Sequence, residues 1–108
     1  MFWADTTPQR CADAAGELAG YVNFGGQDWT VWKYGDEIIV TLDGPGGHGT
    51  CARQTSGTID ILAGLNALKG LGLLTGDTLS QVNTGWEVTY SEGKTFKMND
   101  LWYEVVPK

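Results

Sequence analysis

The stretch 43–57 holds the residues of this chain that are best suited to chemistry. His48 and Cys51 lie close together in it, and His48 is the only histidine. An imidazole beside a thiol can generate a thiolate nucleophile, so the pair is a candidate for a small thiol enzyme. Such pairs usually come from separate elements of a fold, and no local signature of a cysteine enzyme surrounds Cys51. A catalytic Cys51–His48 pair is therefore the weaker interpretation.

The chain has two cysteines, Cys11 and Cys51, and they offer a second kind of chemistry. A disulfide between them would tie the first predicted helix to the stretch 43–57 and contribute roughly 3–4 kcal/mol by loop closure. That bond requires an oxidising compartment, and two unpaired, partly buried thiols are the alternative. A zinc site is weaker still, because only Asp43 and the distant Cys11 could join the nearby ligands. The sequence leaves the state of the cysteines open and predicts no metal.

Three glycines, Gly44, Gly46 and Gly49, match the spacing of a dinucleotide-binding loop after a predicted strand. In that fold the loop opens directly into a long helix whose amino terminus meets the pyrophosphate. Residues 50–57 predict no such helix, so the glycines indicate a turn-forming loop and we expect no cofactor.

The acidic residues do not form the facing pairs that hydrolysis of a glycosidic bond needs, at about 5–9.5 Å. Asp36 with Glu37, and Asn99 with Asp100, lie in predicted turns, where such residues are common for backbone reasons. The sequence therefore favours a protein that is not an enzyme.

The elements that position these residues follow from size and composition. With 108 residues, 42% of them hydrophobic and 19% charged, the chain predicts one folded domain over 1–108. Its net charge of −6 disfavours binding to nucleic acid or to anionic membranes. No apolar run approaches the roughly 20 residues that span a bilayer. We expect a cytoplasmic location because no signal peptide is visible, and an extracellular or periplasmic one if Cys11 and Cys51 are bonded.

The fold class that the patterns predict is α+β, with two antiparallel β-meanders, about 21–42 and 79–106. A short amino-terminal helix is expected from Thr6 or Thr7 to about Leu18. The predicted strands are 21–24, 29–34, 37–42, 79–82, 86–90, 94–98 and 101–106, and the stretch 43–57 has no hydrophobic period.

The strongest helix is predicted over 58–69, packed on the sheet. Thr58 is its expected cap, and Gly70 ends it. Its apolar stripe is expected to consist of Ile61, Leu62, Leu65 and Leu68.

Aromatic residues are the remaining signal, since the chain has five Trp, four Tyr and three Phe. Most of the Trp should lie in the core, and Phe2 and Trp3 should pack there or against a neighbouring chain. Trp29 and Trp32 point to opposite faces of one strand. If a helix covers one face, the other presents a contact surface, which we expect to include Trp32, Tyr34, Trp102 and His48.

The leading hypothesis is a small protein-interaction module, such as an inhibitor, immunity-type protein or particle component of a bacterium or phage. Its partner would be another protein or a second copy of the chain. The alternatives are a module that binds a small ligand or carbohydrate on exposed Trp and Tyr, and the thiol enzyme.

Overall fold

The computed structural model describes residues 1–6, 11, 16–54 and 56–74. These belong to the first of two compact units, Met1–Gly76 and Asp77–Lys108. Every strand predicted beyond residue 74, and Trp102 with them, lies outside the described residues. The assignment of one domain to the whole chain stays a prediction.

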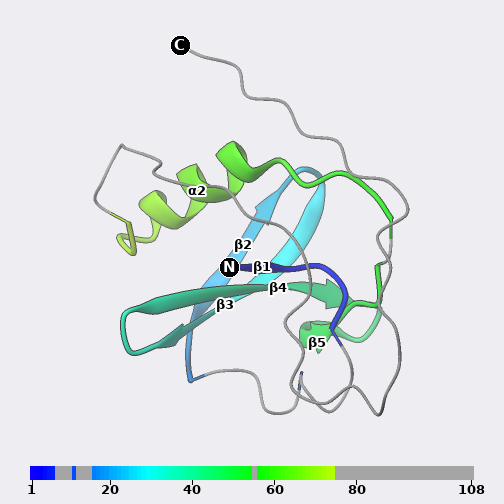
Figure 1. The fold of residues 1–108 in the computed structure, drawn as a ribbon, viewed down its shortest axis with the longest axis horizontal. Helices are drawn as coiled ribbons and strands as arrows, with labels where there is room; N and C mark the ends of the chain where they lie inside the picture. The colour runs from blue at the N-terminus through cyan, green and yellow to red at the C-terminus, as the bar shows by residue number, and fades with distance from the viewer. Residues whose placement is uncertain (7–10, 12–15, 55, 75–108) are drawn as a thin grey trace, which may run out of the picture. The chain divides into compact units, whose positions relative to one another are not determined.

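The described part is a five-stranded sheet with one helix (Figure 1). The main path of the sheet runs β1–β4–β3–β2, and β5 pairs with β4 off this path. The first meander is confirmed, because β2, β3 and β4 pair in sequence and are antiparallel. The bounds are β1 Phe2–Trp3, β2 Glu17–Phe24, β3 Gln27–Tyr34, β4 Glu37–Gly44 and β5 Gly47–Cys51.

The helix α2 comprises Ile61–Gly70 and begins later than predicted. Its cap is Asp60 rather than Thr58: the Asp60 carboxylate accepts the amide hydrogen of Ala63 at 3.0 Å. A carboxylate at this position also interacts favourably with the positive end of the helix dipole. The predicted carboxyl end is confirmed to within one residue.

The apolar stripe of α2 is only partly as predicted. Leu68 is buried in the core, but Leu62 is 56% exposed. The turn of the helix between them contributes the buried Gly64, whose missing side chain lets the rings of Phe2 and Phe24 approach the helix backbone. The helix therefore contacts the sheet along a surface of small residues, which a search for large apolar side chains does not detect.

The core lies between α2 and one face of the sheet. Phe24 stacks on Trp29 with ring centroids 4.8 Å apart, and Phe2 meets both rings edge-on. Phe2 arrives there because β1 pairs in parallel with β4, opposite Val40. The prediction that the first residues pack into the core is thus confirmed for Phe2. The buried apolar residues of this cluster are Phe24, Trp29, Val31, Val40, Leu42 and Leu68.

The predicted amino-terminal helix is wrong at its carboxyl end. Glu17 and Leu18 belong to β2, where they pair with Lys33 and Trp32. Pairing with β3 outweighs the weak helical pattern there, and a backbone with φ +91° at Gly16 is incompatible with a helix. Cys11, the one described residue of 7–15, has helical conformation.

The stretch 43–57 contains a strand, which corrects the expectation of an irregular loop. β4 continues to Gly44, and β5 returns beside it with Gly44 opposite Gly47 and Asp43 opposite Cys51. Hydrophobic alternation could not reveal β5, because glycine supplies two of its five residues and none belongs to the core cluster. Among the described residues, no helix has the length and apolar character needed to cross a bilayer.

Candidate functional site

The face of the sheet opposite α2 carries the candidate site. Side chains alternate between the faces along a strand, so Trp29 and Val31 of β3 enter the core while Thr30 and Trp32 point to the other side. The ladders extend this second face through the pairs Tyr21–Thr30, Thr30–Thr41 and Leu18–Trp32.

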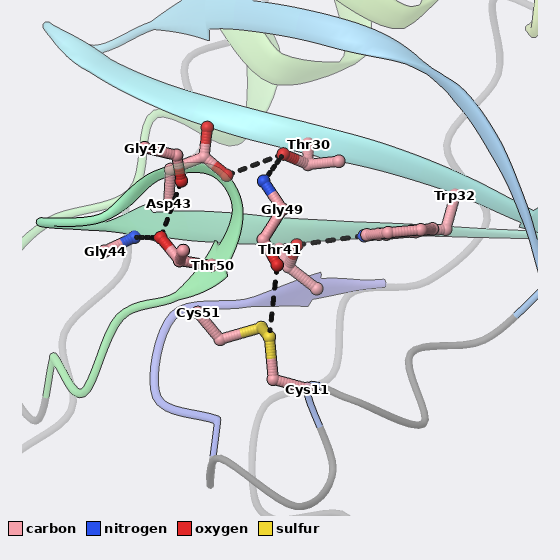
Figure 2. The surroundings of a disulfide bond; sticks show 10 residues. All are labelled: Cys11, Thr30, Trp32, Thr41, Asp43, Gly44, Gly47, Gly49, Thr50 and Cys51. Carbon is pink, nitrogen blue, oxygen red and sulfur yellow. Dashed lines mark hydrogen bonds between the residues drawn. A yellow bond between two sulfur atoms is a disulfide. The ribbon is translucent and has the colours of Figure 1, made fainter.

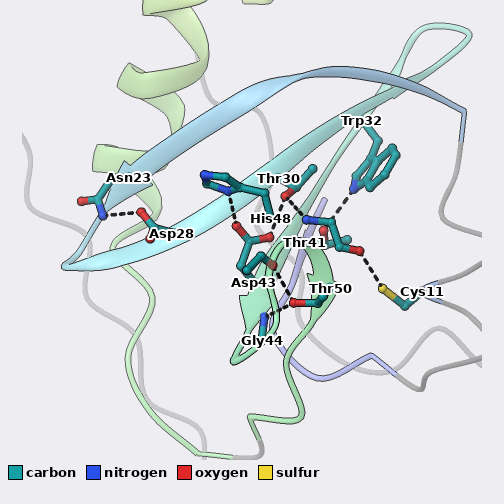
Figure 3. Close-up of polar contacts among 12 residues, drawn as sticks. Cys11, Asn23, Asp28, Thr30, Trp32, Thr41, Asp43, Gly44, His48 and Thr50 are labelled. Carbon is teal, nitrogen blue, oxygen red and sulfur yellow. Dashed lines mark hydrogen bonds and ion pairs between the residues drawn. The ribbon is translucent and has the colours of Figure 1, made fainter.

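Asp43 is the centre of a hydrogen-bond network on this face (Figure 3). Its side chain is only 4% exposed. The Thr30 hydroxyl donates to Oδ1 of Asp43 at 2.6 Å, and Nδ1 of His48 lies 2.7 Å from Oδ2. Both oxygens of this nearly buried carboxylate therefore have a partner, which offsets the cost of removing its charge from water.

His48 is positioned by two contacts of different kinds. Its Nδ1 meets the Asp43 carboxylate, which makes Nδ1 the donor and leaves Nε2 as the outer nitrogen of the ring. Its ring also stacks on Tyr21, with centroids 4.1 Å apart and an interplanar angle of 26°. The His48 side chain remains 49% exposed. A carboxylate that orients an exposed imidazole could support proton transfer, but none of the hydrogen bonds found among the described residues joins Nε2 to a nucleophile.

The strand β5, which carries His48, is attached to the sheet by polar contacts. The amide of Gly49 donates to the Thr30 hydroxyl oxygen at 2.9 Å. The Thr50 hydroxyl accepts the amide hydrogen of Gly44 and donates to the carbonyl of Gly47. These bonds join β5 to both β3 and β4.

A disulfide joins Cys11 to Cys51, the last residue of β5 (Figure 2). The Cys11 sulfur also lies 3.5 Å from the carbonyl oxygen of Gly49. Because a sulfur in a disulfide carries no hydrogen, this is a close contact and not a hydrogen bond. The bond settles the state of the cysteines that the sequence left open, and both cysteines of the chain are used in it.

The disulfide bears on the predicted pair of Cys51 and His48. The Cys51 sulfur is bonded to Cys11, and the Nδ1 of His48 is directed to Asp43 instead. While the disulfide is intact, no thiolate is available beside the imidazole. Their closeness in the sequence therefore does not become a nucleophile–base pair in the structure.

Four side chains of β2 and β3, Leu18, Tyr21, Trp32 and Tyr34, form what we call the aromatic face. Leu18 is 53% exposed and Tyr34 is 63% exposed, and Tyr21 is exposed as well. Trp32 lies directly across the ladder from Leu18, half-buried, and its Nε1 donates to the Thr41 hydroxyl at 3.0 Å. The indole thus has a fixed polar partner, and its neighbours across the two ladders are the exposed Leu18 and the buried Ile39.

The structure places three of the predicted contact residues, Trp32, Tyr34 and His48, on the same side of the sheet. The fourth, Trp102, lies outside the described residues. Leu18, Tyr21, Thr30 and Asp43 also lie on this side of the sheet, and the predicted contact residues do not include them. Strand alternation together with the correct register would have found Tyr21 and Leu18, but Leu18 had been assigned to a helix.

A shallow depression of about 250 Å³ lies at the end of the sheet beside the network. It is smaller than the roughly 300–1,000 Å³ of pockets that enclose a small organic ligand. The residues that line it are Gln27, Asp28, Leu42, Asp43, Gly44, Gly47 and His48.

No cluster of three or more His, Cys, Asp or Glu side chains suited to hold a metal ion occurs within the described part of the chain. The glycines of the dinucleotide-like pattern lie in a β-hairpin there, without a helix amino terminus next to them. Comparisons of the chain with protein-family models, with curated proteins and with solved structures find no match.

Proposed function

We propose that this protein is a binding module that contacts another protein through its aromatic face. The observation that carries the proposal is the exposure of Leu18, Tyr21 and Tyr34 around the fixed indole of Trp32, on the side of the sheet that α2 does not cover. Tyr and Trp are the residues most enriched in binding hot spots, because they bury much area at a small cost in side-chain entropy.

The rigidity of this surface supports the same proposal. Its residues stand on paired strands, and the Trp32 indole and the Tyr21 ring each have a defined partner, Thr41 and His48. A surface that is already ordered loses little conformational entropy when a partner binds. A partner would therefore meet a preformed surface rather than one that must fold on contact.

The charge around the aromatic face indicates the chemistry of the partner. Glu37 pairs with Tyr34 across the β3–β4 ladder, Asp36 occupies the adjoining turn, and Asp28 lies at the other end of β3; all three are exposed. The whole chain has a net charge of −6. We therefore expect a partner whose contact surface has an apolar centre bordered by Lys or Arg, since such charges speed association and select orientation.

The disulfide supports an oxidising compartment as the place where this binding occurs. Disulfides form and persist in oxidising compartments such as the periplasm and the extracellular space. We propose that the protein acts there, as an accessory protein of the inhibitor, immunity or particle-component type.

The test compares the capture of partners by four immobilised proteins, the wild type and three variants, each exposed to an extract of the source organism. Leu18→Ser and Tyr34→Ser each remove one exposed apolar group from the aromatic face. Leu62→Ser is the matched control, since Leu62 is 56% exposed on α2. A specific partner should be retained by the control and lost by both aromatic-face variants. Equal retention of a partner by all four proteins, or capture of no partner by the wild type, would contradict the proposal.

A carbohydrate-binding role is the second candidate, and the surroundings of Tyr21 favour it. The exposed Tyr21 ring lies two residues from Asn23, whose side-chain amide donates to the Asp28 carboxylate at 2.8 Å. An aromatic ring beside such polar groups is suited to stack on a sugar and bond its hydroxyls. Titration of the intrinsic Trp fluorescence with a glycan panel tests this candidate, and it fails if no glycan changes the signal.

A further inference from the structure

A continuous series of contacts leads from the disulfide to the aromatic face. Cys51 ends β5, and Gly49 in the same strand donates its amide hydrogen to Thr30. Thr30 in turn donates to Asp43, which holds His48. His48 then stacks on Tyr21, a member of the aromatic face. Figure 2 shows this series from the disulfide to Asp43, and Figure 3 shows the bonds from Thr30 through Asp43 to His48.

Besides these contacts, β5 is held by its ladder with β4 and by the hydrogen bonds of the Thr50 hydroxyl, but none of its residues belongs to the core cluster. Its first three residues are exposed and the other two are half-buried. Gly47 and Gly49 adopt positive φ angles of 99° and 82°, and glycine loses more backbone freedom on ordering than any other residue. No apolar side chain of β5 reaches the core cluster. Hydrogen bonds at an exposed surface stabilise such a strand only modestly. The covalent bond at Cys51 therefore contributes strongly to keeping β5 in place against the sheet.

We infer that the Cys11–Cys51 bond is a redox switch for the aromatic face: oxidation holds β5 and thereby His48 against Tyr21, and reduction releases them. The inference rests on the proposed function in one respect, namely that the surface it controls is the contact surface. It makes binding conditional on an oxidising compartment. The protein would acquire its complete contact surface only after it reaches that compartment.

The switching reaction is thiol–disulfide exchange with a dithiol reductant. A reductant thiolate attacks one sulfur of the Cys11–Cys51 bond and forms a mixed disulfide, and the other cysteine leaves as a thiolate and takes up a proton. The second reductant thiol then displaces the first cysteine. Two electrons and two protons pass to the protein, which gains two thiols, and the reductant becomes a disulfide. Both cysteines are half-buried rather than enclosed, so a small dithiol can reach them.

The test measures amide hydrogen exchange of the full chain by NMR, before and after reduction with dithiothreitol. On reduction, exchange at Gly49 should become about tenfold faster or more, as expected when a strand loses one or two net hydrogen bonds. The nuclear Overhauser contacts between the His48 and Tyr21 rings should disappear. The amide chemical shifts of Val31 and Val40, in the centre of the sheet, should stay unchanged, because the sheet itself remains folded.

Two results would overturn the inference. Unchanged exchange at Gly49 with the ring contacts retained would show that the polar network holds β5 without the bond. Large chemical-shift changes at Val31 and Val40 together with Gly49 would show that reduction rearranges the whole sheet and is no local switch. The Cys11→Ala/Cys51→Ala variant is the matched control: it should resemble the reduced protein and be insensitive to dithiothreitol. No partner is used, so a failure here is distinct from a failure to find one.

Discussion

Asp43 stands directly opposite Cys51 in the β4–β5 ladder. One pair of residues thus connects a nearly buried carboxylate, which positions His48, to the disulfide that fixes the end of β5. The carboxylate and the disulfide each hold the hairpin in a different way. The carboxylate does so through directional hydrogen bonds, and the disulfide through a covalent bond to Cys11 that also restricts the unfolded chain.

Removal of the disulfide should lower the free energy of unfolding by about 4 kcal/mol, because a loop of this length loses much entropy on closure. The sequence separation of the two cysteines is 40 residues. Urea unfolding of Cys11→Ser/Cys51→Ser measures the loss. Wild-type protein in reductant should unfold at nearly the same urea concentration as the variant, and a difference of less than about 1 kcal/mol between the oxidised protein and the variant would contradict the prediction.

Asp43→Asn should destabilise the protein by about 1–3 kcal/mol. An amide oxygen still accepts from Thr30, but the amide nitrogen then faces the protonated Nδ1 of His48 and cannot accept from it. The stacking of His48 on Tyr21 should weaken as well. Asp28→Asn is the control: this exposed carboxylate bonds only the nearby Asn23 among the contacts described, and its loss should cost less than about 0.5 kcal/mol. Equal effects of the two substitutions on thermal unfolding would refute the assigned role.

Thr30→Val keeps the shape of a fully buried side chain and removes only its hydroxyl. We expect a loss of about 2–3 kcal/mol, because both the Asp43 carboxylate and the Gly49 amide lose a partner. Thr41→Val is the matched change on the neighbouring strand, where the hydroxyl accepts a single bond from the half-buried Trp32. It should cost about 1 kcal/mol. Chemical denaturation measures the loss of stability in both variants. A larger loss for Thr41→Val than for Thr30→Val would contradict the prediction.

Gly64→Ala should destabilise the protein by about 1–2 kcal/mol, although alanine is the better helix former. The new Cβ would come within 2.8 Å of the Phe2 ring and 3.0 Å of the Phe24 ring, and these rings pack against each other and against Trp29. Gly70→Ala, at the other end of α2, meets no atom within 4 Å and should be neutral or slightly stabilising. Circular dichroism during thermal unfolding distinguishes the two, and an increase in stability for Gly64→Ala would show that the rings move aside freely.

Local patterns predicted the elements whose own residues carry a strong signal. Alternation around the tight turns at Gly25 and Gly35 predicted β3 and β4 and the antiparallel order, and both glycines have the positive φ that such turns use. Periodicity with a terminal glycine predicted α2 to within three residues at its start and one at its end. These signals lie within a few residues of one another, so no knowledge of distant contacts is needed to read them.

The errors fall where distant contacts outweigh the local pattern. The local pattern predicts a helix at Leu18, but Leu18 belongs to β2, where it pairs with Trp32 at the edge of β3. β5 has no hydrophobic pattern and is ordered by β4, by Thr30 and by a disulfide to residue 11. The local sequence of these two segments specifies neither the strand with which they pair nor the register of the pairing.

The sequence by itself determined β3, β4, the second half of β2 and the turns between these strands. It also determined the position of α2, the acidic charge, and Trp32, Tyr34 and His48 as candidates for contact. Only the tertiary structure decided that His48 turns to Asp43 and Tyr21 rather than to Cys51, and that Cys51 bonds Cys11. The physical reason is that the contacts of a side chain on a strand depend on the register, which decides the residue that lies opposite it. That choice is made by the burial of Trp29, Val31 and Val40 against α2, which fixes the orientation of both faces at once.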